Sequence, residues 1–558
     1  MGEYTVILIC ILVMAYILNR LENRRVSDKG KKALLRESFG SIPKPENRDY
    51  GGIEYDWDFE RAKLPQCQQV DDITWNDLEM DAVYLRINSC QSFAGEQALY
   101  TALHRLRRSG KEEAVLNETI NFFGEQEQER QQAMYLLHCL GKQRNNYYLP
   151  VFIHNLSGFA IPNIQFYRFM RGLLICSVLP CALLLDTRYL ALPLFAALAN
   201  LVIYSFQKYK YGINLAMLRS TLGIIRTAKQ LSDPKKSGYE DHFHDLSDLA
   251  DRFSRSARRI MRLNTREQGG LSGDLFSLAN AYLVGITLSD FIQYNKLIRE
   301  LEGKKEELLA LYHRIGEIDM AICAASFRAS LPHWCEPCFE EETSVCSLTA
   351  EELYHPLLGH PVSNSVVIGR SCIVTGSNAS GKSTFIKAVA VNVLLAQSIF
   401  TCSAKYFSLP RASLITSMAV RDDIQSGESY YIKEIKYLKR IIDGLSPDTP
   451  AICIVDEILR GTNTQERIAA SCAVLRYLAR HNCLAMVASH DIELTQLLKD
   501  QYDNFHFSEQ ITDGGITFSY QIQPGPADSK NAIRLLEFMG FPGEITREAR
   551  ILAQLEEP

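Results

Sequence analysis

A glycine-rich segment is the part of this chain whose residue types and spacing point most directly to chemistry. Gly376 to Ser383 reads Gly-Ser-Asn-Ala-Ser-Gly-Lys-Ser, which fits the phosphate-loop pattern G-x-x-x-x-G-K-[ST]. An apolar stretch, Ser371 to Val374, precedes the loop, and a helical pattern, Thr384 to Ser398, follows it. In such a strand–loop–helix unit, the backbone N–H groups at the helix N-terminus hold phosphate groups. We therefore expect nucleoside triphosphate binding, with Lys382 on the phosphates and the Ser383 hydroxyl on Mg²⁺.

Two further apolar runs end in residues suited to hydrolysis. Ala451 to Val455 is a continuous apolar run, typical of a strand buried in a parallel sheet, and it leads into Asp456 and Glu457. Asp456 is expected to hold Mg²⁺, and Glu457 to orient or deprotonate the attacking water. Cys483 to Ala488 is a third run, and His490 follows it at a position suited to sensing the γ-phosphate. The predicted catalytic residues are therefore Lys382, Glu457 and His490.

These motifs together resemble one family of ATPases, the MutS proteins. Four segments are similar in chain order: the Walker A segment at Thr375–Thr384, the signature region at Asp422–Glu434, the Walker B segment with its extension at Asp456–Thr464, and the switch histidine at Ala488–Asp491. The tail from Gly525 to Pro542 resembles the family's C-terminal segment. The resemblance is close from about Leu353 to the end, and fainter from Asp77 to Asp319.

The resemblance implies ATP as substrate, Mg²⁺ as cofactor and a homodimer formed through the ATPase domain. Ser429 matches the signature serine that completes the partner's nucleotide site, although Tyr430 stands where the family usually has threonine. Asn364 matches an asparagine on the adenine side, but Pro361 and Val362 occupy the stretch where the family often has a stacking aromatic residue. The expected nucleotide-binding residues are then Gly376, Ser377, Asn378, Ala379, Ser380, Gly381, Lys382, Ser383, Thr384 and Asn364.

Three long apolar segments are not a feature of ordinary MutS proteins. They are Tyr4–Asn19, Gly172–Leu185 and Tyr189–Phe206, and none contains a charged residue. Each is near or slightly below the roughly 20 residues that span a bilayer. Buried core helices are the alternative, but the nearly continuous apolar sequence from 173 to 206 favours a transmembrane hairpin. The lysines and arginines that flank the segments predict a multi-pass protein of the cell membrane, with its ATPase domain facing the cytoplasm.

The sequence thus predicts a multidomain protein. The fold class is an α-helical core and lever region with transmembrane helices, followed by an α/β phosphate-loop ATPase domain of the ABC type. The expected domains are a transmembrane anchor at 4–19, a cytoplasmic linker at 20–66, a helical MutS-like core at 67–319 with the hairpin at 172–206, and the ATPase domain at 320–558 with a C-terminal helical dimerisation segment.

DNA binding would require a local basic surface, because the net charge of the chain is −5. The candidates are Arg105-Leu-Arg-Arg108 and a helical stretch that contains Arg255, Arg258, Arg259 and Arg262. A solvated helix face and a contact to anionic lipid headgroups are the alternatives. The family's mismatch reader is a Phe-x-Glu motif, and Phe123-Gly-Glu125 has these letters. It lies within a helical stretch, so we interpret it as helix packing.

Three hypotheses for function remain from the sequence. The first is a membrane-anchored MutS-like ATPase that is coupled to binding of mismatched or branched DNA in repair. The second is a membrane mechanoenzyme that hydrolyses ATP and binds no DNA. The third is a membrane scaffold that binds nucleotide only to dimerise.

Overall fold

The computed structural model describes residues 28–44, 51–106, 109–184, 187–233, 243–269, 283–340, 346–377, 380–418, 430–459, 461–512, 515–527 and 532–552. The chain forms two compact units, each built from three separate stretches. Unit 1 comprises Met1–Ala62, Asn88–Thr101 and Thr119–Ser326. Unit 2 comprises Lys63–Ile87, Ala102–Glu118 and Phe327–Pro558. The sequence analysis placed 67–319 in one helical region, whereas parts of that region belong to unit 2.

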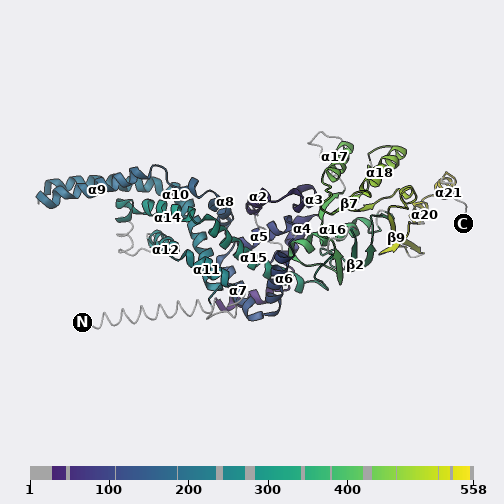
Figure 1. Ribbon diagram of the computed structural model, residues 1–558, viewed down its shortest axis with the longest axis horizontal. Coiled ribbons are helices and arrows are strands. Elements are labelled where there is room, and N and C mark those ends of the chain that lie inside the picture. Colours follow the sequence, from purple (N-terminus) through teal and green to yellow (C-terminus); the bar gives the residue numbers. More distant parts are fainter. Residues whose placement is uncertain are drawn as a thin grey trace. The chain divides into compact units, whose positions relative to one another are not determined.

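The order of elements shows helices first and alternating strands and helices later (Figure 1). The helices before the first strand are α2 (Tyr55–Arg61), α3 (Asp72–Asp77), α4 (Met80–Ile87), α5 (Phe93–His104), α6 (Gly110–Glu125), α7 (Glu127–Leu140), α8 (Leu149–His154), α9 (Ile164–Leu184), α10 (Ala191–Leu231), α11 (His244–Arg252), α12 (Ser254–Gly269), α14 (Ser289–Glu302) and α15 (Lys305–Ala329). The later elements are β1 (Cys338–Phe339), β2 (Leu348–Leu353), β3 (Asn364–Ile368), β4 (Cys372–Thr375), α16 (Lys382–Ile399), β5 (Tyr406–Leu409), β6 (Ser413–Ser417), α17 (Tyr430–Asp443), β7 (Ala451–Asp456), α18 (Thr464–Leu478), β8 (Cys483–Ala488), α19 (Ile492–Leu497), β9 (Asp503–Thr512), β10 (Gly515–Pro524), α20 (Ala532–Phe538) and α21 (Gly543–Leu552).

The centre of unit 2 is a six-stranded sheet with the strand order β10-β9-β4-β8-β7-β6. All neighbours are parallel except β10, which pairs antiparallel with β9. Every residue of β4, β7 and β8 is buried, as expected for strands covered on both faces. The strands predicted from the apolar runs before Gly376, Asp456 and His490 are therefore confirmed. A second sheet has the order β1-β5-β2-β3.

The short helix α3 is held against β6 and α17 within unit 2. The carboxylate of its N-cap residue, Asp71, accepts a hydrogen bond from Thr74 N at 2.8 Å. Both oxygens of this carboxylate also accept from Nη1 of Arg440 in α17, at 2.5 Å. Asp77, at the other end of α3, accepts from the Thr416 hydroxyl at 2.7 Å and from Met418 N at 3.0 Å. The stretch Lys63–Ile87 therefore belongs to the folded unit that contains the phosphate loop.

Unit 1 is helical in the part of the chain that the structure describes. Phe123, the first residue of the Phe-x-Glu letters, is fully buried in α6. Its ring contacts the rings of Phe122 and Phe243. This confirms the interpretation of Phe123-Gly-Glu125 as helix packing.

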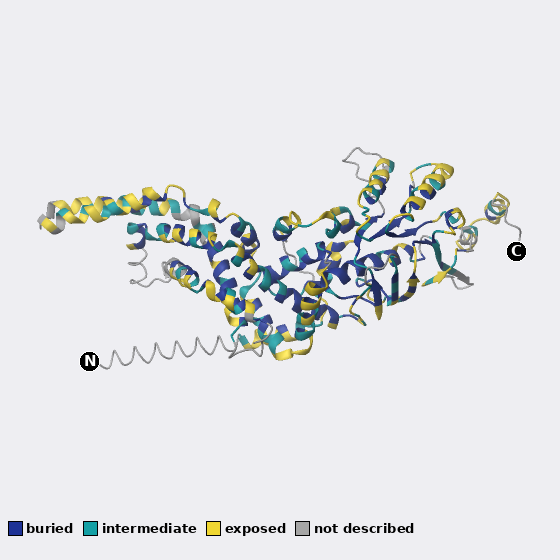
Figure 2. Cartoon of the chain, viewed as in Figure 1, coloured by how far each residue is buried: buried dark blue, intermediate teal, exposed yellow. Residues whose placement is uncertain are grey.

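The apolar segments at 172–206 do form two helices, α9 and α10, which pack against each other. In α9, two charged residues, Arg168 and Arg171, precede the apolar run and so limit its length. Pro180 lies within the run and removes one backbone hydrogen-bond donor from the helix. Tyr167 and Tyr204 each contact Phe291 of α14, and buried Asn200 donates to Ile286 O at 2.8 Å. Figure 2 shows that many residues along α9 are exposed.

Across the described residues, no helix has both the length and the apolar character needed to cross a bilayer. The prediction of transmembrane helices at 172–206 is therefore wrong, and so is the multi-pass membrane localisation that rested on it. The predicted lipid partner loses its support for the same reason. The predicted anchor at 4–19 lies outside the described residues.

A buried carboxylate links two distant stretches of unit 1. Asp319 of α15 accepts from Gln91 N at 3.0 Å, from Ser92 N at 2.7 Å and from the Ser92 hydroxyl at 2.6 Å. A Cβ atom at Gly95 would lie 2.3 Å from Asp319 Oδ2, so glycine is required for this close approach. Burial raises the pKa of Asp319 to about 6, although its hydrogen bonds act in the opposite direction.

This pKa predicts a specific pH dependence of stability. Because the folded state holds the Asp319 proton more tightly than the unfolded state, the free energy of unfolding should fall as pH rises from about 4 to about 6. Two pKa units correspond to roughly 3 kcal/mol. Chemical denaturation of the wild type and of Asp319→Asn at pH 4.5 and 7 measures the effect, and the variant should gain relative stability at pH 7. A stability difference between the two proteins that does not change with pH would contradict the prediction.

Candidate functional site

The residues predicted to do chemistry lie along one edge of the six-stranded sheet. Thr375, Asp456 and Ala488 are the last residues of β4, β7 and β8. These strands are parallel and adjacent in the order β4-β8-β7, so their carboxyl ends meet. The phosphate loop, Glu457 and His490 follow directly after these ends and are therefore brought together.

Backbone geometry explains the two glycines of the phosphate loop. Gly376 has φ +142° and Gly381 has φ +105°, both of which side chains rarely allow. A Cβ atom at Gly376 would lie 2.7 Å from Phe507 O of β9. Gly381 is the N-cap residue of α16. The loop therefore lies close against β9 and leads directly into the helix.

The loop positions the Lys382 ammonium before any nucleotide is bound. Nζ donates to Gly376 O at 2.6 Å and to Ser377 O at 2.8 Å, and Lys382 is only 4% exposed. These two backbone acceptors hold the ammonium group at the start of α16. The N-terminus of α16 adds a partial positive charge at the same place.

Glu457 and His490 form a hydrogen-bonded pair at this edge. Glu457 Oε1 lies 3.0 Å from His490 Nε2, and Lys382 Nζ lies 3.5 Å from the same nitrogen. The shorter contact favours Nε2–H as a donor to Glu457. Glu457 itself has φ +57°, and its N–H donates to Ala488 O of β8 at 2.9 Å. Such backbone strain typically costs about 1–3 kcal/mol and is concentrated at functional sites.

Asp456 and Ser383 have the donor atoms that Mg²⁺ requires. Asp456 is 7% exposed, and its Oδ1 atom is buried with no hydrogen-bond partner among the described residues. A buried carboxylate oxygen without a partner is costly, and a divalent cation or its water shell would satisfy it. Ser383 is exposed and lines the adjacent cavity. The residues present therefore fit Mg²⁺.

An ion pair holds the residue that follows His490. Arg467 of α18 binds both carboxylate oxygens of Asp491, at 2.7 and 3.0 Å. The hydrogen bond to Asp491, together with the nearby charges of Glu457 and Glu493, raises the pKa of Arg467 above its usual value. Through this pair, α18 restrains the backbone next to His490. The N-cap residue of α18 is Asn463.

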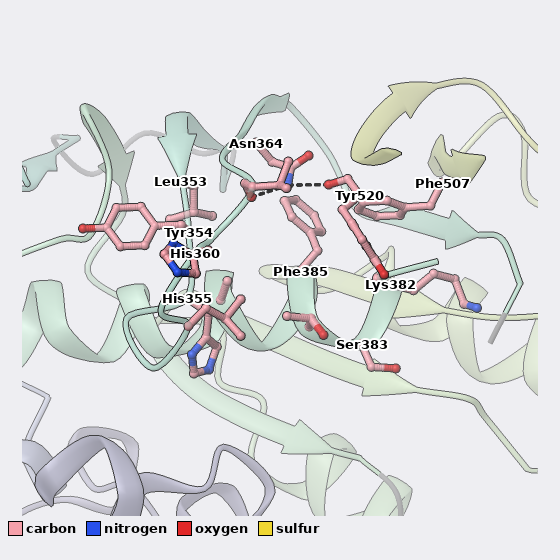
Figure 3. Close-up of a pocket in the computed structure, with 15 residues that line it drawn as sticks. Leu353, Tyr354, His355, His360, Asn364, Lys382, Ser383, Phe385, Phe507 and Tyr520 are labelled. Carbon is pink, nitrogen blue, oxygen red and sulfur yellow. Dashed lines mark hydrogen bonds between the residues drawn. The ribbon is translucent and has the colours of Figure 1, made fainter. Parts of the chain in front are cut away.

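A cavity of about 430 Å³ opens beside Lys382 (Figure 3). Its lining residues are Leu353, Tyr354, His355, Leu358, His360, Val362, Asn364, Gly381, Lys382, Ser383, Thr384, Phe385, Ala388, Phe507 and Tyr520. One end is polar and belongs to the phosphate loop, whereas the other is largely apolar and aromatic. A volume of this kind is typical of a site for a small molecule.

Asn364 lines the cavity, but its amide group is used by the protein. Nδ2 donates to Tyr520 O at 3.0 Å, and Oδ1 accepts from Ile522 N at 2.7 Å. Asn364 thus fixes an irregular part of β10, where the register with β9 shifts between Phe518 and Ile522. Its place on the adenine side of a bound nucleotide stays a prediction.

Tyr520 is an aromatic residue of the cavity that the sequence analysis missed. It lies in the β10 irregularity with φ +52°, and a Cβ atom at Gly381 would lie 3.2 Å from its ring. The ring is therefore close to the start of α16 and is 44% exposed. Buried His355 adds no positive charge at neutral pH, because burial lowers its pKa to about 4.

Other predicted residues are not gathered at this edge. Asn378, Ala379 and Ser429 lie outside the described residues. The four arginines belong to α12 of unit 1, where Arg255, Arg258 and Arg262 are exposed. Arg259 forms an ion pair with Glu300 of α14.

Comparisons with known proteins agree with this site. Residues 372–556 match the family model "MutS domain V". The chain is 27% identical over 342 residues to the DNA mismatch repair protein MutS of Streptococcus uberis, covering 58% of this chain and 39% of that protein. It is 29% identical over 341 residues to the MutS of Streptococcus gordonii, again covering 58% and 39%. To the MutS of Thermus thermophilus it is 30% identical over 181 residues, covering 32% of this chain and 22% of that protein.

The matched region spans about two fifths or less of each relative's length. The segment 372–556 that matches the family model includes the phosphate loop, Asp456, Glu457, His490 and Tyr520. Residues 372–556 of this chain therefore match MutS domain V, the ATPase domain of MutS-type proteins.

Proposed function

We propose that this chain binds and hydrolyses ATP with Mg²⁺ as a homodimer, and that the cycle is coupled to binding of mismatched or branched DNA in repair. The observation that carries the ATPase part is the convergence of Lys382, Glu457 and His490 beside a cavity. His490 lies 3.0 Å from Glu457 and 3.5 Å from Lys382, and these contacts join three segments far apart in the sequence. The strained backbone of Glu457 supports this proposal, because such strain is concentrated at functional sites.

The residues divide the chemistry of phosphoryl transfer between them. The Lys382 ammonium and the N-terminus of α16 bind the phosphate oxygens and favour the charge that develops on them. The Glu457 carboxylate orients the attacking water and accepts its proton. His490 holds that carboxylate through Nε2–H and so fixes its orientation. Bound Mg²⁺ would neutralise phosphate charge, and Asp456 and Ser383 are the residues that would hold it.

The aromatic end of the cavity is the proposed site of the base. Tyr520 gives a ring beside Gly381, and His360 approaches from the segment before Asn364. These residues supply the flat surface that was not evident from Pro361 and Val362. Ser429 of a second copy is proposed to complete the phosphate end across the dimer.

Replacing Glu457 by Gln should separate binding from hydrolysis. The amide keeps the size of the side chain but accepts no proton, so we expect kcat to fall roughly 10²- to 10⁴-fold. ATP binding should remain, and gel filtration with ATP should show an increased fraction of dimer. Steady-state phosphate release and nucleotide binding by fluorescence measure these effects.

Glu351→Gln is the matched control, because Glu351 is an exposed residue of β2 that does not line the cavity. Its turnover should equal that of the wild type. Negligible turnover in the wild type that Glu457→Gln leaves unchanged would instead support a protein that binds nucleotide only to assemble.

The DNA part of the proposal rests on the exposed face of α12. Arg255, Arg258 and Arg262 are spaced by three and four residues, which places them along one side of the helix. The opposite side is buried through Ile260 and Leu263. The Arg259–Glu300 pair removes Arg259 from the set that would contact phosphates. A row of arginines on one helix face is suited to a DNA backbone, and a solvated face is the alternative.

A triple change of Arg255, Arg258 and Arg262 to Ala should weaken DNA binding with little effect on basal ATPase activity. The slope of log affinity against log salt should become shallower by about 0.9 for every phosphate that the variant no longer neutralises. Fluorescence anisotropy with matched, mismatched and branched duplexes at several salt concentrations measures this. Arg480→Ala, an exposed arginine of the ATPase domain, serves as the control. Equal affinity of the triple variant and the wild type would exclude α12 as the DNA-binding surface.

A further inference from the structure

One acidic residue beside the phosphate loop has no role in the chemistry described above. Glu509 belongs to β9, the strand against which Gly376 lies. The Ser377 hydroxyl donates a hydrogen bond to Glu509 Oε2. Because side chains alternate along a strand, Glu509 is on the same face of β9 as Phe507, which lines the cavity. The carboxylate is therefore fixed at the second residue of the phosphate loop.

The other acids of the site have different partners. Glu457 pairs with His490, and Asp456 has the buried oxygen that fits Mg²⁺. Glu509 is bound to a hydroxyl of the loop itself, in a place where the surrounding groups favour anions. Lys382 and the N-terminus of α16 attract phosphates there, whereas a carboxylate on the loop repels them.

We propose that Glu509 is an affinity-lowering residue of the nucleotide site: the Ser377 hydroxyl holds its carboxylate on the phosphate loop, where it weakens phosphate binding and speeds release of ADP. The inference rests on the proposed function, since it requires that the loop binds a nucleotide. It adds a charge that opposes binding to a site otherwise built to attract anions. Two unit charges roughly 8 Å apart near a protein surface change an affinity by roughly threefold to thirtyfold.

Glu509→Gln distinguishes a charge effect from a structural one. The amide oxygen still accepts from the Ser377 hydroxyl, so the tether stays while the charge is lost. We expect the full-length variant to bind Mg²⁺ and N-methylanthraniloyl-ADP roughly threefold to thirtyfold more tightly, with a slower dissociation rate in stopped-flow chase experiments. The gain should shrink at high salt, because mobile ions screen the repulsion.

Ser377→Ala is the matched variant, because it removes the tether and keeps the carboxylate. It should bind the probe no more tightly than Glu509→Gln. Glu351→Gln, which removes an exposed charge from β2, should match the wild type. Thermal unfolding of each protein verifies that the fold is retained.

The outcomes separate this inference from the proposed function. If the wild type binds the probe and Glu509→Gln binds it equally or more weakly, Glu509 is only an anchor for the loop and the inference is overturned. A tighter variant whose gain does not depend on salt would also contradict a charge effect. If the folded wild type and Glu509→Gln both fail to bind the probe, the proposed function falls and takes this inference with it.

Discussion

The order of three parallel strands is the constraint on which the rest of the site depends. Lys382, Glu457 and His490 are separated by long stretches of sequence and meet because β4, β8 and β7 are neighbours. Each strand is buried along its whole length, so packing on both faces of the sheet fixes its register. A shift of one residue in the register of β7 would turn each of its side chains, including that of Asp456, to the other face of the sheet. Glu457, which follows the strand, would be displaced with it. The contacts between His490, Glu457 and Lys382 are thus a consequence of apolar packing several residues away.

Acidic residues at this edge acquire different roles from different partners. Glu457 is held by an imidazole N–H, Glu509 by a hydroxyl, and Asp456 Oδ1 by no group among the described residues. A hydrogen bond to a carboxylate fixes its orientation and stabilises its charge. An oxygen without such a bond remains available as a ligand. In the roles proposed above, the same functional group therefore serves as base, as repulsive charge and as cation ligand, according to what contacts it.

The sequence predicted those parts of the site that depend on local pattern. The strands before Gly376, Asp456 and His490 were visible as apolar runs, and the loop glycines were visible because a short motif encodes their conformation. Tyr520 was not visible, because its position depends on an irregularity in β10 that Asn364 stabilises from a distant strand. The hairpin at 172–206 shows the opposite error. Apolar content alone does not reveal that Tyr204 and Asn200 of this segment, and Tyr167 just before it, make contacts within unit 1.

Unit 2 also contains a tertiary relation that no local pattern could indicate. The described residues stop at Met418 after β6 and resume at Tyr430, and Ser429 lies between them. Asp77 binds Thr416 and Met418 on the first side, while Asp71 binds Arg440 of α17 on the second. Both aspartates bracket α3, which lies outside the region that matches MutS domain V. A displacement of α17 relative to β6 would have to break the Asp71–Arg440 pair or move α3. The two ends of the segment that contains Ser429 are therefore coupled through a helix far upstream, in the same folded unit as the phosphate loop.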